Sequence, residues 1–437
     1  MKQKTKSVLG WLVIVLISLV PAFLLFYFGP PTQNLFSYPI LTQKLGQLFA
    51  LTAITLFALT FILSTRIKFI EDVFGGLDKV YIVHGLLGGA ALVLILFHPI
   101  LLVLKFIPTD VALAAEYLLP SSYWSVNFGI IALLGLISLI YITLYTKIKY
   151  HKWKLSHKFL GLVFIIAVLH MFLVREDASR DFIFNGYYIF ASIVSLIGIS
   201  GFSYTLFIKN KTLQEAVYKI DVIETKNEIN EITFIPDRKP LKYKSGQFIF
   251  VRFYNENLSK EQHPFSIASK SNDPKIKIII KNLGDFTKDV HMLKIGDKVL
   301  IEGPYGRFNY TRKDDVDQVW LAGGIGVTPF IGMAKDLSNN MKSKIDLFYS
   351  VSQDKDFISL NILKSVENVN KNFRIIPWVT KEKGYLTLKN IEEVTGNLKN
   401  KEFYMCGPSS FKKSIKENLL RIGVKSDKIY EEEFDFK

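Results

Sequence analysis

Six long apolar stretches without charged residues alternate with short charged loops over the first 210 residues. A helix that crosses a bilayer needs about 20 apolar residues, so each stretch can form one. The fifth stretch is short, but its start extends back through Lys158 and His157, because a terminal lysine can reach the membrane surface. The pattern predicts a six-helix transmembrane bundle with spans at Val8–Phe28, Leu45–Thr65, Val80–Leu104, Tyr117–Thr146, Phe159–Val174 and Phe182–Ile208.

The rest of the chain shows two shorter patterns. Residues 211–314 contain β-rich runs separated by turns, which predict an antiparallel β-barrel. Residues 315–437 alternate buried strands with helical segments, which predicts an α/β domain with a parallel sheet. We therefore expect three domains, 1–210, 211–314 and 315–437. The ten predicted strands are Val217–Glu224, Ile229–Pro236, Gln247–Phe253, Phe265–Ala268, Lys275–Lys281, Lys298–Glu302, Gln318–Ala322, Ile345–Ser350, Phe373–Val379 and Glu402–Met405.

Charge and cysteine content narrow the class of protein. Of 54 Lys and Arg and 39 Asp and Glu residues, residues 1–210 hold only 16 and 8, which excludes a wholly soluble globule and a disordered chain. A disulfide-stapled domain is excluded because Cys406 is the only cysteine. The net charge of +15 divides into +8 and +7 between the two halves and is not gathered into a nucleic-acid-binding arm, so solubility and anionic lipid head groups explain it more simply.

Basic residues gather in alternate loops of the predicted bundle. The N-terminus, residues 66–79, residues 147–154 and residues 209–211 fall on one side, which the positive-inside rule makes cytoplasmic. We read Val8–Phe28 as a retained helix, and an even number of spans then leaves both termini in the cytoplasm. The sequence thus predicts a multi-pass protein of the cell membrane with residues 211–437 in the cytoplasm, where Cys406 stays reduced.

Four histidines lie in two of the predicted spans. His84 and His98 are 14 residues apart, which places them on one helix face about 21 Å apart. His157 and His170 are 13 residues apart, or about 20 Å. Both spans run from inside to outside, so His84 is level with His157 and His98 with His170. Two facing pairs predict the axial ligands of two stacked haem irons. The alternative is that each histidine only forms an interhelical hydrogen bond.

One spacing does not suit an ideal helix. A separation of 13 residues turns His170 about 140° away from His157. A π-bulge, an altered twist or an asymmetric approach of the rings must correct this difference, and Gly161 offers a place for a bulge.

Motifs in the second half occur in a characteristic order. They are His263-Pro264-Phe265-Ser266, Gly284-Asp285-Phe286-Thr287, Gly303-Pro304-Tyr305-Gly306, Leu321-Ala322-Gly323-Gly324-Ile325-Gly326-Val327-Thr328-Pro329 and Cys406-Gly407-Pro408. This order resembles the flavin and nicotinamide module of ferredoxin reductases. Together with six spans and paired histidines, the whole chain resembles the NADPH oxidase and ferric reductase superfamily.

The resemblance implies cofactors and roles for particular residues. FAD, two b-type haems and NAD(P)H as the electron donor are expected. The first motif would lie along the flavin, and Gly284 and Thr287 would hold its pyrophosphate. Cys406 and Gly407 would border the nicotinamide, and Phe436, or else Phe434, would stack on the flavin. The residues expected to bind the NAD(P)H phosphates are Gly323, Gly324, Gly326, Thr328, Pro329 and Ser350.

Simpler roles remain open for two of these residues. The sequence also departs from the family pattern at the position that selects the nucleotide. His263 could be an ordinary loop histidine, and Cys406 a small buried residue at a strand end. Relatives that prefer NADPH often follow the second strand with Ser and Arg. Here Ser350 is followed by Lys355 and no nearby arginine. The preference between NADH and NADPH is therefore open.

The expected function is transmembrane electron transfer from cytoplasmic NAD(P)H through FAD and two haems to an external acceptor. With both axial positions of each iron filled, the acceptor would be reduced at the haem edge. Oxygen, giving superoxide, is the first choice, and a ferric chelate is the alternative. A haem-sensing or transport protein with a regulatory flavin domain is the remaining hypothesis. The sequence does not specify accessory subunits.

Overall fold

The computed structural model describes residues 3–27, 37–107, 109–174, 186–209, 215–226, 228–271, 273–310, 316–338 and 341–432. The chain divides into two compact units, 1–212 and 213–437. Each unit is described by itself below.

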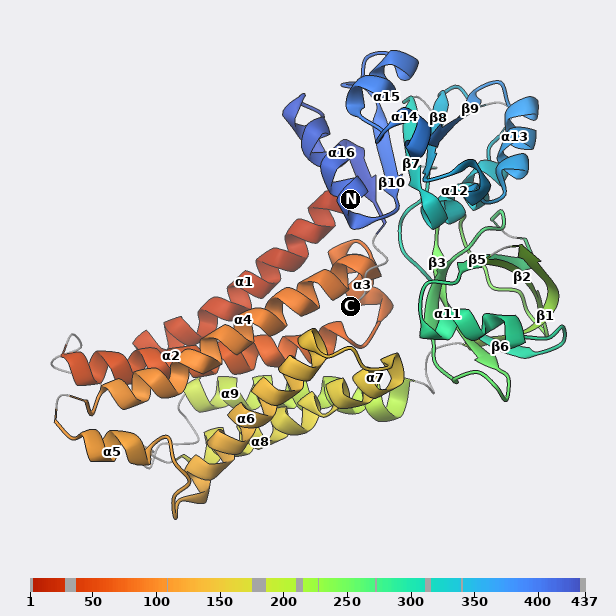
Figure 1. Cartoon of the computed structure of the whole chain (residues 1–437). Coiled ribbons are helices and arrows are strands. Elements are labelled where there is room, and N and C mark those ends of the chain that lie inside the picture. Colours follow the sequence, from red (N-terminus) through yellow and green to blue (C-terminus); the bar gives the residue numbers. More distant parts are fainter. Residues whose placement is uncertain are drawn as a thin grey trace. The chain divides into compact units, whose positions relative to one another are not determined.

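The first unit is helical, and the six predicted spans are confirmed as six helices long and apolar enough to cross a membrane (Figure 1). Their outward faces carry apolar side chains such as Leu16, Leu86, Leu134 and Leu196, which suits a lipid environment. The elements are α1 (Gln3–Tyr27), α2 (Tyr38–Leu63), α3 (Lys68–Phe74), α4 (Leu77–Leu104), α5 (Val111–Glu116), α6 (Trp124–Tyr145), α7 (Tyr150–Lys158), α8 (Leu160–Leu173), α9 (Gly186–Ser203) and the π-helix η2 (Tyr204–Ile208).

Close packing of α2, α8 and α9 forms a small apolar core. Phe164 on α8 is fully buried and lies 5.4 and 5.2 Å from the rings of Phe57 and Phe61 on α2. Gly198 on α9 accommodates this ring, because a Cβ there would approach it to 2.5 Å. The same helices thereby fix α8, which carries His170.

The fourth span begins later than predicted. Helix α6 starts at Trp124, whereas the apolar stretch starts at Tyr117. Pro120 interrupts helix formation, and the Asn127 side chain then binds both the amide and the carbonyl of Ser121. Hydrophobicity alone could not locate this polar turn. The start of the sixth predicted span, at Phe182, lies outside the described residues.

The second unit begins with a six-stranded antiparallel sheet in the order β4-β3-β6-β1-β2-β5. Its strands are β1 (Glu215–Lys226), β2 (Ile229–Pro236), β3 (Phe248–Tyr254), β4 (His263–Ser266), β5 (Ile276–Lys281) and β6 (Lys298–Tyr305). The predicted barrel is not closed. Strands β4 and β5 form the two edges of the sheet, and just past the end of β4 an isolated bridge links Ile267 to Ile278 of β5. The short helix α11 (Asp285–Asp289) and the 3₁₀ turn η3 (Val290–Met292) lie between β5 and β6.

A parallel five-stranded sheet follows, in the order β11-β10-β7-β8-β9. Four of its strands were predicted, and the short β11 was not. Apolar clusters on both faces of the sheet pack against helices, as in doubly wound folds. The elements are β7 (Gln318–Gly323), η4 (Gly324–Val327), α12 (Thr328–Lys335), β8 (Ile345–Val351), η5 (Asp354–Asp356), α13 (Leu360–Val369), β9 (Phe373–Val379), α14 (Thr380–Lys383), α15 (Leu388–Thr395), β10 (Glu402–Cys406), α16 (Ser409–Arg421), η6 (Ser426–Lys428) and β11 (Ile429–Glu431).

Candidate functional site

The four membrane histidines face each other in two pairs. The ring centroids of His84 and His157 are 6.0 Å apart, and those of His98 and His170 are 6.4 Å apart. A metal–imidazole bond is about 2 Å long, so two rings that share one metal ion have centroids roughly 6 Å apart. Both pairs therefore have the separation that axial haem ligation requires.

Hydrogen bonds fix the orientation of the histidine rings. Nδ1 lies 3.0 Å from the Thr60 carbonyl in His84, 2.9 Å from the Gly46 carbonyl in His98 and 2.7 Å from the Ser125 carbonyl in His170. A carbonyl oxygen only accepts, so Nδ1 carries the proton and Nε2 keeps its lone pair. This is the arrangement that a metal-binding histidine uses.

His157 is oriented by a side chain instead of a carbonyl. Its Nδ1 lies 3.4 Å from Oγ1 of Thr143. That hydroxyl donates its own hydrogen to the Leu139 carbonyl at 2.7 Å, so it accepts from His157. All four rings are thus placed to offer Nε2 as a ligand.

A helix break corrects the spacing of His157 and His170. The fifth span is divided at Phe159, where α7 ends and α8 begins. The Phe159 amide donates to the carbonyls of Ser156 and His157, which is a tighter turn than an α-helix makes. The two histidines therefore lie on separate helical segments, and the ideal 13-residue angle does not apply.

Small residues leave space beside the histidines. On α4, Gly88 lies between His84 and His98 on the same face, and no described atom lies within 4 Å of the position of an added Cβ. On α6, a Cβ at Gly129 would lie 2.7 Å from the His170 ring. Gly88 therefore leaves open space on this face of α4, whereas Gly129 lets the His170 ring pack directly against α6.

The flavin motif lies on β4 and next to α11. His263, Pro264, Phe265 and Ser266 form β4, which pairs with β3. The His263 ring stacks on Phe286 of α11 with centroids 3.8 Å apart, and its Nε2 lies 3.3 Å from a Glu261 oxygen. The first two predicted flavin motifs are thereby in direct contact.

Thr287 acts on the backbone of its own turn. Its Oγ1 accepts hydrogen bonds from the amides of Leu283 and Gly284, each at 2.9 Å. The hydroxyl therefore shapes the start of α11, a role that the sequence analysis did not assign to it.

The predicted nucleotide residues meet at the carboxyl edge of the parallel sheet. Gly323 at the end of β7 pairs with Ser350 on β8, and Ala322 pairs with Cys406 on β10. The glycine-rich turn packs tightly here, because a Cβ at Gly326 would lie 2.4 Å from the Cys406 carbonyl. Gly407 has a φ of +152°, and a Cβ there would lie 3.0 Å from the backbone of Gly323. This edge is where open α/β sheets bind ligands.

The start of α12 completes this edge. Thr328 begins the helix, and its hydroxyl donates to the Ile325 carbonyl at 2.8 Å. Pro329 occupies the first turn, where its missing amide hydrogen is not needed. Gly324 has a φ of +55° and open space around its missing Cβ. The turn therefore presents backbone, and not side chains, to a ligand.

Three family profiles match successive parts of the chain. They are the ferric reductase like transmembrane component over residues 49–168, an FAD-binding domain over 214–309 and an oxidoreductase NAD-binding domain over 320–417. The chain belongs to the ferric reductase and NADPH oxidase superfamily. The six-helix bundle of this superfamily member is thus joined to two nucleotide-binding domains.

Relatives of this superfamily member include oxidases from animals and plants. Dual oxidase 1 of Caenorhabditis elegans is 28% identical over 57% of this chain and 18% of its own length. Respiratory burst oxidase homolog protein D of Arabidopsis thaliana is 34% identical over 33% of this chain and 17% of its own length. This chain therefore spans less than a fifth of each relative. A solved cytochrome P450 reductase of Amycolatopsis matches 51% of this chain and 70% of its own, with 18% identity and a TM-score of 0.46.

Two residues near the His84–His157 pair were not predicted. Trp153 stacks on His157 with centroids 5.3 Å apart and an angle of 12°, and its indole N–H donates to the Thr143 carbonyl at 3.1 Å. The spacing of four residues between Trp153 and His157 could have indicated this contact. Thr143 lies on another helix, so no spacing in the sequence could indicate its contact with His157.

The stacking of Phe436 or Phe434 on the flavin remains a prediction. Phe434 and Phe436 lie outside the described residues. The preceding Glu432 is buried, and its amide donates to the Met405 carbonyl at 3.1 Å. The chain is thus anchored next to Cys406 just before the tail.

Proposed function

We propose that this protein carries electrons from NAD(P)H, by way of FAD and two haems, to oxygen on the opposite side of the membrane, which yields superoxide. One observation carries the proposal. The four histidines form two facing pairs, hydrogen bonds at Nδ1 orient the rings, and the distance between ring centroids in each pair suits two axial ligands of one iron. When bound, FAD accepts a hydride and releases single electrons, which haem irons can carry.

The proposed haem ligands are His84 with His157 and His98 with His170. The carbonyls of Thr60, Gly46 and Ser125 hold three of these rings, so each ring is positioned before a ligand binds. Hydrogen bonds at Nδ1 also raise the basicity of Nε2. Within the described residues, no group of three or more His, Cys, Asp or Glu side chains is placed to hold a bare metal ion.

The proposed dinucleotide site is the edge formed by Gly323, Gly324, Gly326 and Thr328, with Cys406 and Gly407 beside the nicotinamide. Backbone amides of the glycine-rich turn at a helix start would favour a pyrophosphate group. Ser350 lies next to Gly323 in the sheet and would contact the ribose side of the nucleotide. His263, Pro264, Phe265, Ser266, Gly284 and Thr287 would hold the flavin.

Oxygen is favoured as the acceptor because the matched animal and plant relatives are named as oxidases. A ferric chelate is the alternative, since the transmembrane profile is described as ferric reductase like. The helical bundle would lie in the cell membrane. Residues 211–437 would then lie in the cytoplasm, because the basic loops of the bundle place that side inside by the positive-inside rule.

Oxygen consumption and ferric-chelate reduction by the purified full chain distinguish these acceptors. With FAD, haem and NADPH or NADH supplied, we expect oxygen consumption and dismutase-sensitive reduction of cytochrome c. Ferric-chelate reduction that persists without oxygen and exceeds oxygen consumption would make the chain a ferric reductase. Failure of NAD(P)H to reduce the bound haems would contradict electron transfer altogether.

A further inference from the structure

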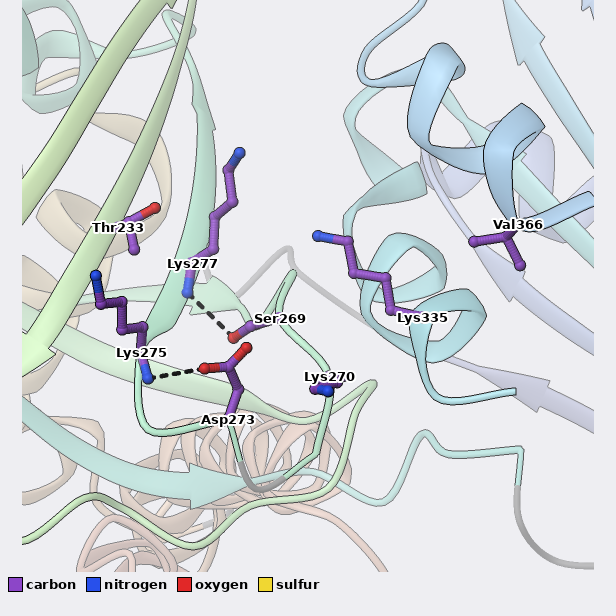
Figure 2. Close-up of a pocket in the computed structure, with 8 residues that line it drawn as sticks. All are labelled: Thr233, Ser269, Lys270, Asp273, Lys275, Lys277, Lys335 and Val366. Carbon is purple, nitrogen blue, oxygen red and sulfur yellow. Dashed lines mark hydrogen bonds between the residues drawn. The ribbon is translucent and has the colours of Figure 1, made fainter. Parts of the chain in front are cut away.

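Four lysines line a pocket of about 460 Å³ in the second unit. Figure 2 shows Lys275 and Lys277 on the side of the flavin sheet and Lys335 on α12, with the side chains of Lys277 and Lys335 directed into the space between them. The remaining lining residues are Thr233, Ser269, Lys270, Asp273 and Val366. The pocket thus combines several ammonium groups with hydroxyl oxygens and one apolar wall.

The pocket lies where the flavin sheet contacts the nucleotide-binding part of the same unit. Nearby, the Ser271 amide donates to both carboxylate oxygens of Asp336 at 3.0 Å. The Ser359 hydroxyl donates to Glu231 at 2.7 Å, and Lys335 Nζ donates to the Ala268 carbonyl at 3.3 Å. Side chains from both parts therefore define the pocket walls.

The charges of this pocket are only partly compensated. Lys275 pairs with Asp221 at 2.8 Å, and Lys277 forms an ion pair with Glu231. Among the residues that the structure describes, no carboxylate lies within ion-pair distance of the ammonium groups of Lys270 or Lys335. Asp273 is the acidic lining residue, and its carboxylate accepts the Lys275 amide at 3.0 Å.

Lys335 experiences this excess of positive charge directly. Burial lowers its pKa from the ordinary value, and the charge of Lys277 lowers it further, while Glu231 and Asp273 act in the opposite direction. Two lysines from opposite walls therefore repel each other in a partly buried space. A bound anion would remove this repulsion.

We propose that this pocket binds a small soluble anion with two adjacent phosphoryl groups. Ammonium groups from opposite walls match separate phosphoryl groups, and Thr233 and Ser269 offer hydroxyl contacts. A volume of about 460 Å³ accommodates such an anion with its bound water. Lysine binds phosphate as a point charge and needs no fixed fork geometry.

This site is separate from the predicted dinucleotide edge. Helix α12 begins at Thr328, beside the glycine-rich turn, and Lys335 is its last residue. Seven residues of helix separate the two by about 10 Å along the axis. The inference does not depend on the proposed electron route, because binding is measured without turnover.

An anion held by both walls would stabilise the contact between the two parts. A ligand that binds only the folded arrangement raises its stability by mass action. We therefore expect diphosphate to raise the unfolding temperature of the flavin-loaded full chain, with no redox reaction required.

Isothermal titration of the purified, FAD-loaded full chain with inorganic diphosphate tests the proposal. Saturating NAD⁺, which cannot reduce FAD, is present to occupy the dinucleotide edge, and ionic strength is matched with potassium chloride. We expect one diphosphate per chain, and Lys335→Gln and Lys270→Gln should each weaken binding about tenfold, as loss of one ammonium–phosphate contact predicts.

Two variants serve as controls. Lys335→Arg keeps the charge and should bind diphosphate nearly as well as the unmodified chain, and Lys371→Gln removes an exposed lysine outside the pocket and should have no effect. If Lys335→Gln does not fold, the exposed Lys270 supplies the decisive variant. Absence of saturable binding would overturn the proposal. So would competition by NAD⁺, or binding by both glutamine variants that is as tight as in the unmodified chain.

Discussion

At the scale of single residues, the atom beside each histidine Nδ1 decides which nitrogen can serve as a ligand. Three backbone carbonyls and one threonine hydroxyl perform this role. The glycines of the nucleotide-binding turn show a steric requirement of the same kind. Gly326 is the sharpest case, because the Cys406 carbonyl fills the space a Cβ would need.

Replacing Gly326 by Ala should weaken NAD(P)H binding. The new Cβ would lie 2.4 Å from a backbone oxygen, so the turn must shift. Overpacking of this kind costs about 1–3 kcal/mol, and we expect the dissociation constant for NADH to rise while FAD content stays the same. Fluorescence titration measures both quantities.

Gly85→Ala is the matched control for Gly326→Ala. At Gly85, no described atom lies within 4 Å of the added Cβ. It should leave nucleotide affinity unchanged. Unaltered NADH affinity in Gly326→Ala would show that the turn does not hold the nucleotide as proposed.

The sequence could predict the residue types at both sites, but not their contacts. Histidine spacing indicated two pairs, and the glycine-rich motif indicated close backbone approach. The hydrogen-bond partner of His157 could not be predicted, because Thr143 lies on a different helix. Thr287 was expected at the flavin phosphate, and its contacts with the Leu283 and Gly284 amides depend on a turn geometry that no spacing specifies.

At the scale of secondary-structure elements, the break between α7 and α8 allows two histidines at an unsuitable spacing to reach their partners. Hydrophobic periodicity predicted one continuous span here and could not predict the turn at Phe159. The same limitation applies to α6, whose start is set by Pro120 and Asn127. The position of β2 was predicted better, since its buried and more exposed residues alternate.

Trp153 should hold the His157 ring in position. Trp153→Leu removes both the stacking on His157 and the indole hydrogen bond, and we expect affinity for one of the two haems to fall about tenfold. Trp153→Phe retains an aromatic ring and should lose less. Pyridine haemochrome assays during dialysis report haem per chain.

Trp11→Leu controls for the loss of a membrane tryptophan, because Trp11 is an exposed residue of α1. It should retain both haems. If Trp153→Leu and Trp11→Leu retain equal amounts of haem, Trp153 does not position His157 for haem binding and only fills space in the bundle.

Thr287 should act through the start of α11. Thr287→Ala removes the acceptor for two amides, and loss of such a cap costs about 1 kcal/mol. Flavin affinity should therefore fall, and Thr287→Ser should restore it because the hydroxyl remains. Equilibrium dialysis with FAD measures the effect, and full affinity in Thr287→Ala would exclude this contribution.

At the scale of the whole molecule, contacts between the flavin sheet and the nucleotide-binding part join the two halves of the second unit. Glu231 is central among them, because it accepts hydrogen bonds from Lys277 and Ser359. Burial alone would raise the pKa of Glu231, but these hydrogen bonds and the charges of Lys277 and Lys335 hold that pKa below its ordinary value.

This lowered pKa predicts how stability depends on pH. The Glu231 contribution is complete above the ordinary glutamate pKa of about 4.3, and it is lost as pH falls through the lower folded-state value. Between about pH 5 and pH 3, the unfolding temperature of Glu231→Gln should therefore fall less than that of the unmodified chain. FAD fluorescence follows the transition. Glu382→Gln, at an exposed position, should behave as the unmodified chain does, and identical pH profiles for all three would refute the role of Glu231.

The central claim is that electrons cross the membrane through the two histidine pairs. The most direct test uses vesicles that contain the oriented full chain with FAD and haem, ferricytochrome c trapped inside and NADPH outside. We expect dismutase-sensitive reduction of the trapped cytochrome. No such reduction is expected with His98→Ala, which should keep the haem held by His84 and His157 and lose the haem held by His98 and His170. Reduction confined to cytochrome c added outside, or undiminished internal reduction in His98→Ala, would contradict the account.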